Sequence, residues 1–477
     1  MPSRDHGTGA SGSGPDRGAS AGQLRERALD VLLDPALAHI VGLVCWIESG
    51  VVHVADARGH VAMPDGTEPV VLAGRDPVAD QDPFSDSTTA YPFAADRLRS
   101  LFADARAPDL AVVHTGAHHW PERGGHLGEH GSLNGVQSRG PLLLSGAGVA
   151  ARGVLDAVAR SVDVGATLAH LCGGSYEDMD GVPLEQVRPA AAHVVGLLWD
   201  GAQCADLLHL ATTGALPGLA RLLRRGCALR GGAIAAFPSV TLVNHTCALT
   251  GLGPGRHGIV HNAFYDRSTG QQVVPNAPAH WQAAMQWLRP GVRTIFQRMP
   301  AGAVSACVND PVDQGATYST FALIRQQAAG TGALLDQLPP AAADPSASPE
   351  HVGNPDYAWG TQVDASGLDQ VLQLWRQPVP PRLTWWNTTL TDAGHHAGGP
   401  GSAIARAAMR DADSRLGIWL DLVEARELLD DTVILLTADH GSQAAVPGCT
   451  GDWDQALREA GVTFRDEAYG FLYLGGA

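Results

Sequence analysis

The chain has 477 residues, 45% of them apolar, which is enough for one large domain or two or three ordinary ones. All 32 basic residues are arginine, against 49 acidic residues, and the formal charge of −17 disfavours nucleic-acid binding through a basic surface. The absence of lysine excludes Schiff-base chemistry and a P-loop lysine.

The N-terminal residues and the cysteines indicate the cellular compartment of the protein. The seven cysteines are scattered without a C-x-x-C pair, which is typical of reduced, structural thiols. Residues 1–22 are rich in glycine and serine and lack the apolar run of a secretory signal, so they predict a disordered tail. No apolar run approaches the ~18 residues that would span a bilayer. We expect a soluble, cytoplasmic protein with no membrane association.

The first part of the chain predicts a mixture of helices and strands. The runs HIVGLVCWIE and VVHVADA, separated by Ser-Gly, indicate a hairpin. The other expected elements are a helix at 22–33, a Pro/Asp/Gly-rich loop over 60–92, a helix at 93–105, strands at 109–115 and 141–148, and a helix near 164–171.

A second α/β series follows the polar, turn-rich stretch 176–190, which resembles a linker. The expected strands are 193–200, 303–309, 382–388 and 433–441, and the expected helices are 203–213, 217–225 and 401–428. Residues 265–375 include a Pro/Ala/Asp-rich region that predicts a cap-like insertion. Apolar strands alternating with helices predict an α/β/α sandwich with a mostly parallel central sheet.

Aspartate and histidine, which are common metal ligands, follow three predicted strands. Asp200 ends HVVGLLWD, Asp392 and His396 follow RLTWWNT, and Asp439 and His440 end VILLTADHG. Each one alone fits a helix cap or a turn. Three such sites at the carboxyl ends of strands in one sheet instead predict a metal centre. Mixed Asp/His ligation suits Zn²⁺ better than Mn²⁺ or Fe.

The stretch 237–266, FPSVTLVNHTCALTGLGPGRHGIVHNAFYD, predicts the reactive centre. It follows a strand-like apolar run, and from Thr241 the apolar residues have helical spacing until Gly251. A helix N-terminus favours a phosphate or an alkoxide. Taken alone, Thr241 fits an N-cap. The three strand-end sites favour a reactive hydroxyl instead.

These motifs together resemble the alkaline phosphatase superfamily, most closely its type I phosphodiesterase/nucleotide pyrophosphatase branch. The motifs are WDG at 199–201, FPSVTLVNH…TGLGPGRHGIVHN…YD at 237–266, D-x-x-x-H at 392–396 and ADHG at 438–441. The resemblance implies that Thr241 is the nucleophile and that Asn262 holds a phosphate oxygen. His245 and His257 flank this site in sequence, and we interpret both as structural.

The resemblance also implies two zinc ions, with Mn²⁺ as the alternative. One ion is bound by Asp200, Thr241, Asp439 and His440, and the other by Asp392, His396 and one more histidine that the family carries near its C-terminus. No histidine follows His440 in this chain.

Residues 109–171 resemble the missing end of the superfamily domain. By that likeness the last ligand is His130, in GEHGS, with His126 as its nearest competitor. We therefore expect a circular permutation, in which 23–175 is the usual C-terminal part, 176–190 a linker and 191–477 the usual N-terminal and central parts. A fusion of partial copies is the alternative.

The resemblance implies hydrolysis of a phosphodiester or a nucleotide pyrophosphate in a small-molecule substrate. A phosphomonoesterase and a phosphonate hydrolase are alternatives within the superfamily, whereas a sulfatase is disfavoured because Thr241 lacks the C-x-P-x-R context. A member that only binds a phosphorylated ligand or a partner protein is the non-enzymatic alternative. The sequence indicates no particular oligomeric state.

Overall fold

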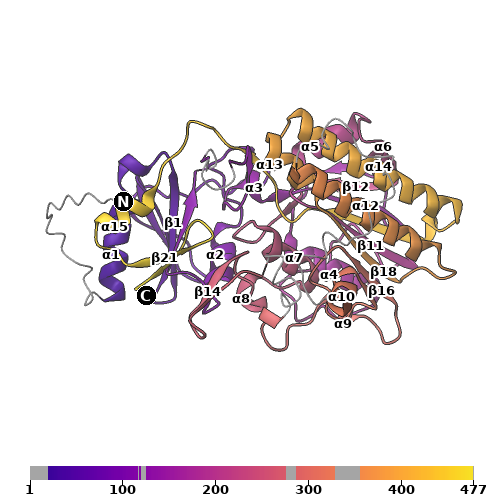
Figure 1. Cartoon of the computed structure of the whole chain (residues 1–477), viewed down its shortest axis with the longest axis horizontal. Helices are drawn as coiled ribbons and strands as arrows, with labels where there is room; N and C mark the ends of the chain where they lie inside the picture. Colours follow the sequence, from indigo (N-terminus) through magenta and orange to yellow (C-terminus); the bar gives the residue numbers. More distant parts are fainter. Residues whose placement is uncertain (1–19, 116–117, 120–124, 276–285, 328–354, 476–477) are drawn as a thin grey trace, which may run out of the picture.

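The computed structural model describes residues 20–115, 118–119, 125–275, 286–327 and 355–475. Two lobes lie side by side, each built on its own sheet, and the early and late parts of the chain meet in the same lobe (Figure 1). Among the described helices, none has the length and apolar character needed to cross a bilayer.

The larger sheet has the strand order β17-β16-β18-β11-β19-β8-β12-β9. Its strands are β17 (Tyr318–Ser319), β16 (Ser305–Val308), β18 (Leu383–Thr388), β11 (His193–Trp199), β19 (Thr432–Thr437), β8 (Leu142–Gly146), β12 (Gly226–Leu229) and β9 (Gly153–Leu155). Neighbours from β17 to β19 are parallel, and only β8 is antiparallel to both of its neighbours.

Helices cover both faces of this sheet (Figure 1). One face carries α5 (Cys204–Thr212), α6 (Pro217–Arg224), α12 (Pro355–Arg376) and α14 (Ala403–Ala425), and the other carries α4 (Ser161–Cys172), α7 (Thr241–Thr250) and α9 (Ile295–Arg298). In β11, Val194 and Leu198 pack toward α4 and α7, whereas Val195 and Leu197 pack toward the opposite helices. Burial on both faces explains the continuous apolar run of this strand. The predicted α/β/α sandwich with a mostly parallel central sheet is confirmed.

The smaller sheet is antiparallel, with the order β21-β22-β5-β1-β2-β3-β4. Its strands are β21 (Phe464–Glu467), β22 (Phe471–Leu474), β5 (Leu110–His114), β1 (Val41–Glu48), β2 (Val51–Asp56), β3 (Gly59–Met63) and β4 (Val70–Gly74). Helix α2 (Ala94–Phe102) packs on one face, and α1 (Ala21–Leu32) and α15 (Trp453–Glu459) pack on the other.

The hairpin predicted for the first strands is confirmed as β1 and β2, but the loop predicted over 60–92 is wrong where β3 and β4 form. Turn-forming residues surround these short strands and conceal them in the sequence. Gly59 of β3 pairs with Gly74 of β4. A Cβ added to Gly59 would lie 1.9 Å from a backbone oxygen, and a Cβ added to Gly74 would lie 2.0 Å from another.

The remaining described α-helices and strands are short. They are β6 (Gly128–Glu129), α3 (Gly135–Ser138), β7 (Arg139–Gly140), β10 (Ala159–Arg160), β13 (Ala233–Ile234), α8 (Pro254–His257), β14 (Phe264–Asp266), β15 (Gln271–Val273), α10 (Thr320–Gln327), α13 (Leu390–Gly398) and β20 (Gln443–Ala444). The region 265–375, for which a cap-like insertion is predicted, contributes β16 and β17 to the large sheet. Within the predicted tail 1–22, α1 already begins at Ala21, and residues 1–19 lie outside the described part.

The two sequence segments on either side of 176–190 share both sheets. Strands β8 and β9 of the first segment pair with β19 and β12 of the second, and β22 of the second pairs with β5 of the first. The stretch 176–190 contains no helix or strand, but ion pairs of Asp178 with Arg298 (2.5 Å) and of Asp180 with Arg256 (2.7 Å) fix it to the core.

We expect Leu472→Ala, in β22, to lower the free energy of unfolding by about 2–5 kcal/mol, because this fully buried side chain leaves a cavity between β5 and the helices α1 and α15. Urea unfolding measures the change. Val379→Ala is the matched control, since Val379 is 81% exposed and its truncation should change stability little. Equal effects of the two substitutions would contradict the packing described.

Candidate metal centre

The predicted ligands meet at one edge of the large sheet because their strands are parallel. Asp200 follows β11, Asp439 and His440 follow β19, and α13 begins two residues after β18. Asp392 and His396 lie four residues apart on α13, on the same face of the helix, and His396 Nε2 is 3.1 Å from Asp392 Oδ2. The sequence did not predict this helix.

His130 reaches the same edge because β8 runs in the opposite direction to β19. The start of β8 lies beside the end of β19, with Leu142 opposite Thr437. Just before it, β6 pairs with β20 and places Glu129 opposite Gln443. The chain that enters β8, including His130, therefore lies next to the segment that follows His440.

Thr241 is the first residue of α7 and not its N-cap. The N-cap is Val240, and no side chain caps the helix. Thr241 Oγ1 lies 3.5 Å from His440 Nε2. The Leu242 backbone N–H donates to Asn262 Oδ1 at 3.0 Å, which leaves the Asn262 amide nitrogen as the atom able to donate to a substrate oxygen.

All seven predicted ligand positions lie in one continuous cluster. Three of the four described groups with ligand atoms within 4.8 Å of one another contain these residues: Asp200, Asp392 and His440; Asp200, His245 and Asp439; and His130, Asp392 and His396. Thr241 joins them through His440, whose Nε2 is 3.1 Å from Asp439 Oδ2 and 3.7 Å from Asp200 Oδ1.

Backbone carbonyls orient the three predicted histidine ligands. The bonds are His130 Nδ1 to Ser239 O (3.2 Å), His396 Nδ1 to Gly128 O (2.8 Å) and His440 Nδ1 to Gly441 O (2.9 Å). A carbonyl oxygen only accepts, so each Nδ1 carries the proton and each Nε2 has a free lone pair. This is the usual arrangement around a metal-binding histidine.

The carboxylates of the cluster have oxygens that no protein group satisfies. Among the described residues, Asp200 Oδ1, Asp392 Oδ1 and Asp439 Oδ2 are buried without a hydrogen-bond partner. Buried polar atoms are normally paired, since an unpaired one costs free energy. Divalent cations would satisfy these oxygens, so the residues present fit a metal centre.

Burial and the neighbouring charges raise the pKa values of some groups in the cluster and lower those of others. Burial, with the neighbouring Asp439 and Asp392, raises the pKa of Asp200 well above its usual range. Burial alone would also raise the pKa of Asp392, but His396, His130 and His440 together hold that pKa well below its usual range. Burial lowers the pKa of His130 to about 3, and His440 adds to the effect. Burial alone would lower the pKa of His396, but Asp392 and Glu129 raise it to about 9. A bound cation would displace that proton, because histidine binds metals in its neutral form.

His245, which we had interpreted as structural, lies at the centre with Asp310, a residue that the sequence analysis did not single out. His245 Nδ1 is 2.9 Å from Asp310 Oδ2, and His245 Nε2 is 3.6 Å from Asp439 Oδ2 and 3.8 Å from Asp200 Oδ2. Asp310 also accepts from Trp385 Nε1 at 2.8 Å. Asp310 follows β16 as Asp200 follows β11, and this position after a strand could have identified Asp310 from the sequence. His257, in contrast, lies in the core beside Cys247.

Two cavities adjoin the cluster. One, of about 350 Å³, is lined by Asp200, Thr241 and apolar side chains that include Phe321 and Trp359. The other, of about 1060 Å³, contacts the cluster at His130 and extends to the β21–β22 hairpin. His126 and His396 line both cavities.

The model of the type I phosphodiesterase / nucleotide pyrophosphatase family matches residues 194–476. Ectonucleotide pyrophosphatase/phosphodiesterase family member 3 of Mus musculus is 25% identical over 214 residues, which are 43% of this chain and 20% of the relative. Alkaline phosphatase PafA of Elizabethkingia meningoseptica is 34% identical over 132 residues, 28% of this chain and 23% of the relative. An uncharacterized pyrophosphatase/phosphodiesterase of Schizosaccharomyces pombe is 51% identical over 45 residues, 9% of each protein. The chain thus spans less than a quarter of the length of these relatives.

Two solved structures resemble part of this chain. Murine ectonucleotide pyrophosphatase/phosphodiesterase 5, an inactive variant in complex with AMP, is 18% identical over 52% of this chain and 57% of its own, with a TM-score of 0.35. Phosphonoacetate hydrolase from Sinorhizobium meliloti, in complex with phosphonoformate, is 25% identical over 54% of this chain and 59% of its own, also with a TM-score of 0.35. Likeness at this level carries no argument about function. The family model covers more than half of the chain, and the protein belongs to the type I phosphodiesterase/nucleotide pyrophosphatase family.

Proposed function

We propose that the protein hydrolyses phosphodiester or nucleotide pyrophosphate bonds of small molecules, with Thr241 as the nucleophile and two divalent cations as cofactors. The observation that carries the proposal is the position of the Thr241 hydroxyl, 3.5 Å from His440 Nε2 in a cluster with three unpaired carboxylate oxygens. Membership of a family of metal-dependent hydrolases supports it.

We assign the cations to two positions, as the family resemblance implies. Asp200, Thr241, Asp439 and His440 would hold one, and Asp392, His396 and His130 the other. Imidazole nitrogens combined with carboxylate oxygens suit Zn²⁺, with Mn²⁺ as the alternative. His245 Nδ1 pairs with Asp310, and its Nε2 lies 3.6 Å from Asp439 Oδ2 and 3.8 Å from Asp200 Oδ2.

The protein groups then have separate tasks. When bound, the cations lower the pKa of the Thr241 hydroxyl and neutralise the charge that builds up on the phosphoryl group. Thr241 Oγ1 forms a bond to phosphorus as the bond to the leaving oxygen breaks on the opposite side. The amide of Asn262 donates to a non-bridging oxygen, beside the N-terminus of α7. Water then cleaves the phosphothreonine ester and restores the hydroxyl.

A diester is favoured over a monoester by the two cavities that adjoin the cluster. A monoester has one substituent on phosphorus and a diester has two. The cavities of about 350 and 1060 Å³ lie near Thr241 and Asn262 respectively, so each is available to one substituent. A screen with mono-, di- and pyrophosphate esters and a phosphonate on zinc-loaded protein distinguishes the phosphomonoesterase and phosphonate hydrolase alternatives. Two bound zinc ions without turnover of any of these would favour the binding protein.

The same proposal includes a circular permutation, with 23–175 as the usual C-terminal part, 176–190 as the linker and 191–477 as the remainder. Both segments contribute strands to both sheets: they alternate in the β19-β8-β12 part of the large sheet, and they meet at the β22-β5 pairing of the smaller one. Partial copies fused end to end would instead complete separate sheets. The permutation accounts for a ligand such as His130 that precedes the others in the chain.

Thr241→Ala should reduce hydrolysis of bis-p-nitrophenyl phosphate by at least about a thousandfold, because it removes the attacking oxygen. Initial rates on zinc-loaded protein measure the loss. Thr241→Ser keeps a hydroxyl and should retain part of the activity. Unfolding midpoints of both variants should match the wild type, and turnover by Thr241→Ala would exclude it as the nucleophile.

His130→Ala should lower the zinc content from two ions per chain toward one, because His130 is grouped with Asp392 and His396. Metal analysis after gel filtration measures the content. His126→Ala is the matched variant, and we expect it to keep both ions, since the group that includes His126 does not contain Asp392. The reverse result would make His126 the ligand.

Removal of the cations should destabilise the protein, because the carboxylates of Asp200, Asp392 and Asp439 would lose their counter-charge. Zinc at about a thousand times its Kd contributes about 4 kcal/mol to the free energy of unfolding. Thermal unfolding with a chelator and after zinc is restored measures the difference. An unfolding temperature indifferent to both treatments would contradict a metal centre.

A further inference from the structure

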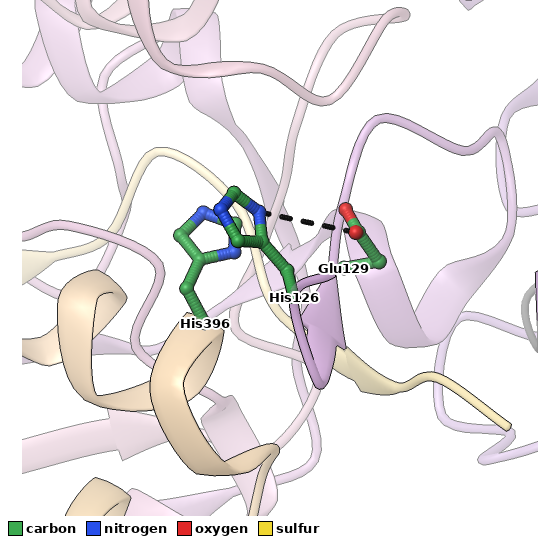
Figure 2. Close-up of side chains that lie close together, drawn as sticks. All are labelled: His126, Glu129 and His396. Carbon is green, nitrogen blue, oxygen red and sulfur yellow. Dashed lines mark ion pairs between the residues drawn. The ribbon is translucent and has the colours of Figure 1, made fainter. Parts of the chain in front are cut away.

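A second group of ligating side chains lies immediately outside the predicted centre. His126, Glu129 and His396 have ligand atoms within 4.8 Å of one another, and Figure 2 shows the three side chains facing the same space. His126 Nδ1 lies 3.9 Å from Glu129 Oε1, and the His126 and His396 ring centroids are 4.0 Å apart. Two imidazoles and a carboxylate are a common ligand set of zinc.

This outer group shares His396 with the inner group of His130, Asp392 and His396. His396 Nδ1 donates to Gly128 O at 2.8 Å, so only Nε2 remains for a metal, and Nε2 lies 3.1 Å from Asp392 Oδ2. A single nitrogen lone pair binds one cation at a time. The outer and inner positions are therefore alternatives for one cation.

The outer group is the more accessible of the two. The side chains of His126 and Glu129 are 38% and 24% exposed, whereas those of Asp392 and His396 are 18% and 15% exposed. His126 lines both cavities that adjoin the cluster, and Glu129 lines the larger one. In the smaller cavity His126 lies in the same lining as Asp392, and in the larger one as His130, so a cation in either cavity is beside the outer group as well as the inner one.

We propose that His126, Glu129 and His396 form a transfer site, in which a divalent cation of the zinc class binds in transit to the inner set. This inference rests on the proposed two-metal centre. A cation loses much hydration free energy when it enters a buried site in one step. In the transfer site the cation would exchange part of its water for His126, Glu129 and His396. It would then keep His396 and exchange His126 and Glu129 for Asp392 and His130.

The rate of metal loading tests the proposal. Full-length protein is stripped with a chelator and mixed with Co²⁺, and the visible absorbance of bound cobalt is followed by stopped flow. The double variant His126→Ala/Glu129→Gln should load the inner position about tenfold more slowly than the wild type, yet reach the same two ions per chain. The control His209→Ala/Glu459→Gln removes the same groups from exposed positions on α5 and α15 and should load normally.

Three results would overturn the proposal. Equal loading rates in the double variant and the wild type would show that no cation passes through the outer group. A double variant that saturates at one ion per chain would make His126 or Glu129 a permanent ligand. A wild type that binds fewer than two ions would remove the proposed two-metal centre itself, and the transfer site with it.

Discussion

The structure depends on one electrostatic constraint, the burial of several carboxylates at a single edge of the large sheet. Asp200, Asp392 and Asp439 each have a buried oxygen without a protein partner, and burial together with the two neighbouring carboxylates raises the pKa of Asp200. Such a group is stable only with compensating positive charge. Backbone carbonyls orient the three histidines, and bound cations would supply the compensating charge. The hydroxyl of Thr241 lies at this edge too, 3.5 Å from His440 Nε2.

The direction of each strand determines which residues reach this edge of the large sheet. Parallel β11, β18 and β19 bring three sites from the second segment to the same edge, whereas antiparallel β8 brings the chain around His130 from the first. The short pairing of β6 with β20 fixes the register, with Glu129 opposite Gln443. A centre built in this way needs both segments of the chain.

Much of this arrangement could be predicted from the sequence, because strands buried on both faces, such as β11, are continuous apolar runs. Strands β3 and β4 could not, since both are short and surrounded by turn residues, and every residue of β4 is exposed. The contact of His245 with Asp310 arises only from tertiary packing of α7 against the end of β16. His126 and His130 are equivalent as residue types, and only the register of β6 separates His130, beside Asp392, from His126, beside Glu129.

The central claim is that one metal centre is assembled from both segments of the chain. Anomalous diffraction at the zinc edge, from crystals of the zinc-loaded protein, tests it most directly. The account predicts two peaks in the cluster, one of them about 2.1 Å from a nitrogen of His130 and bound also by Asp392 and His396. A single peak, or a second peak bound without any residue of the first segment, would contradict it.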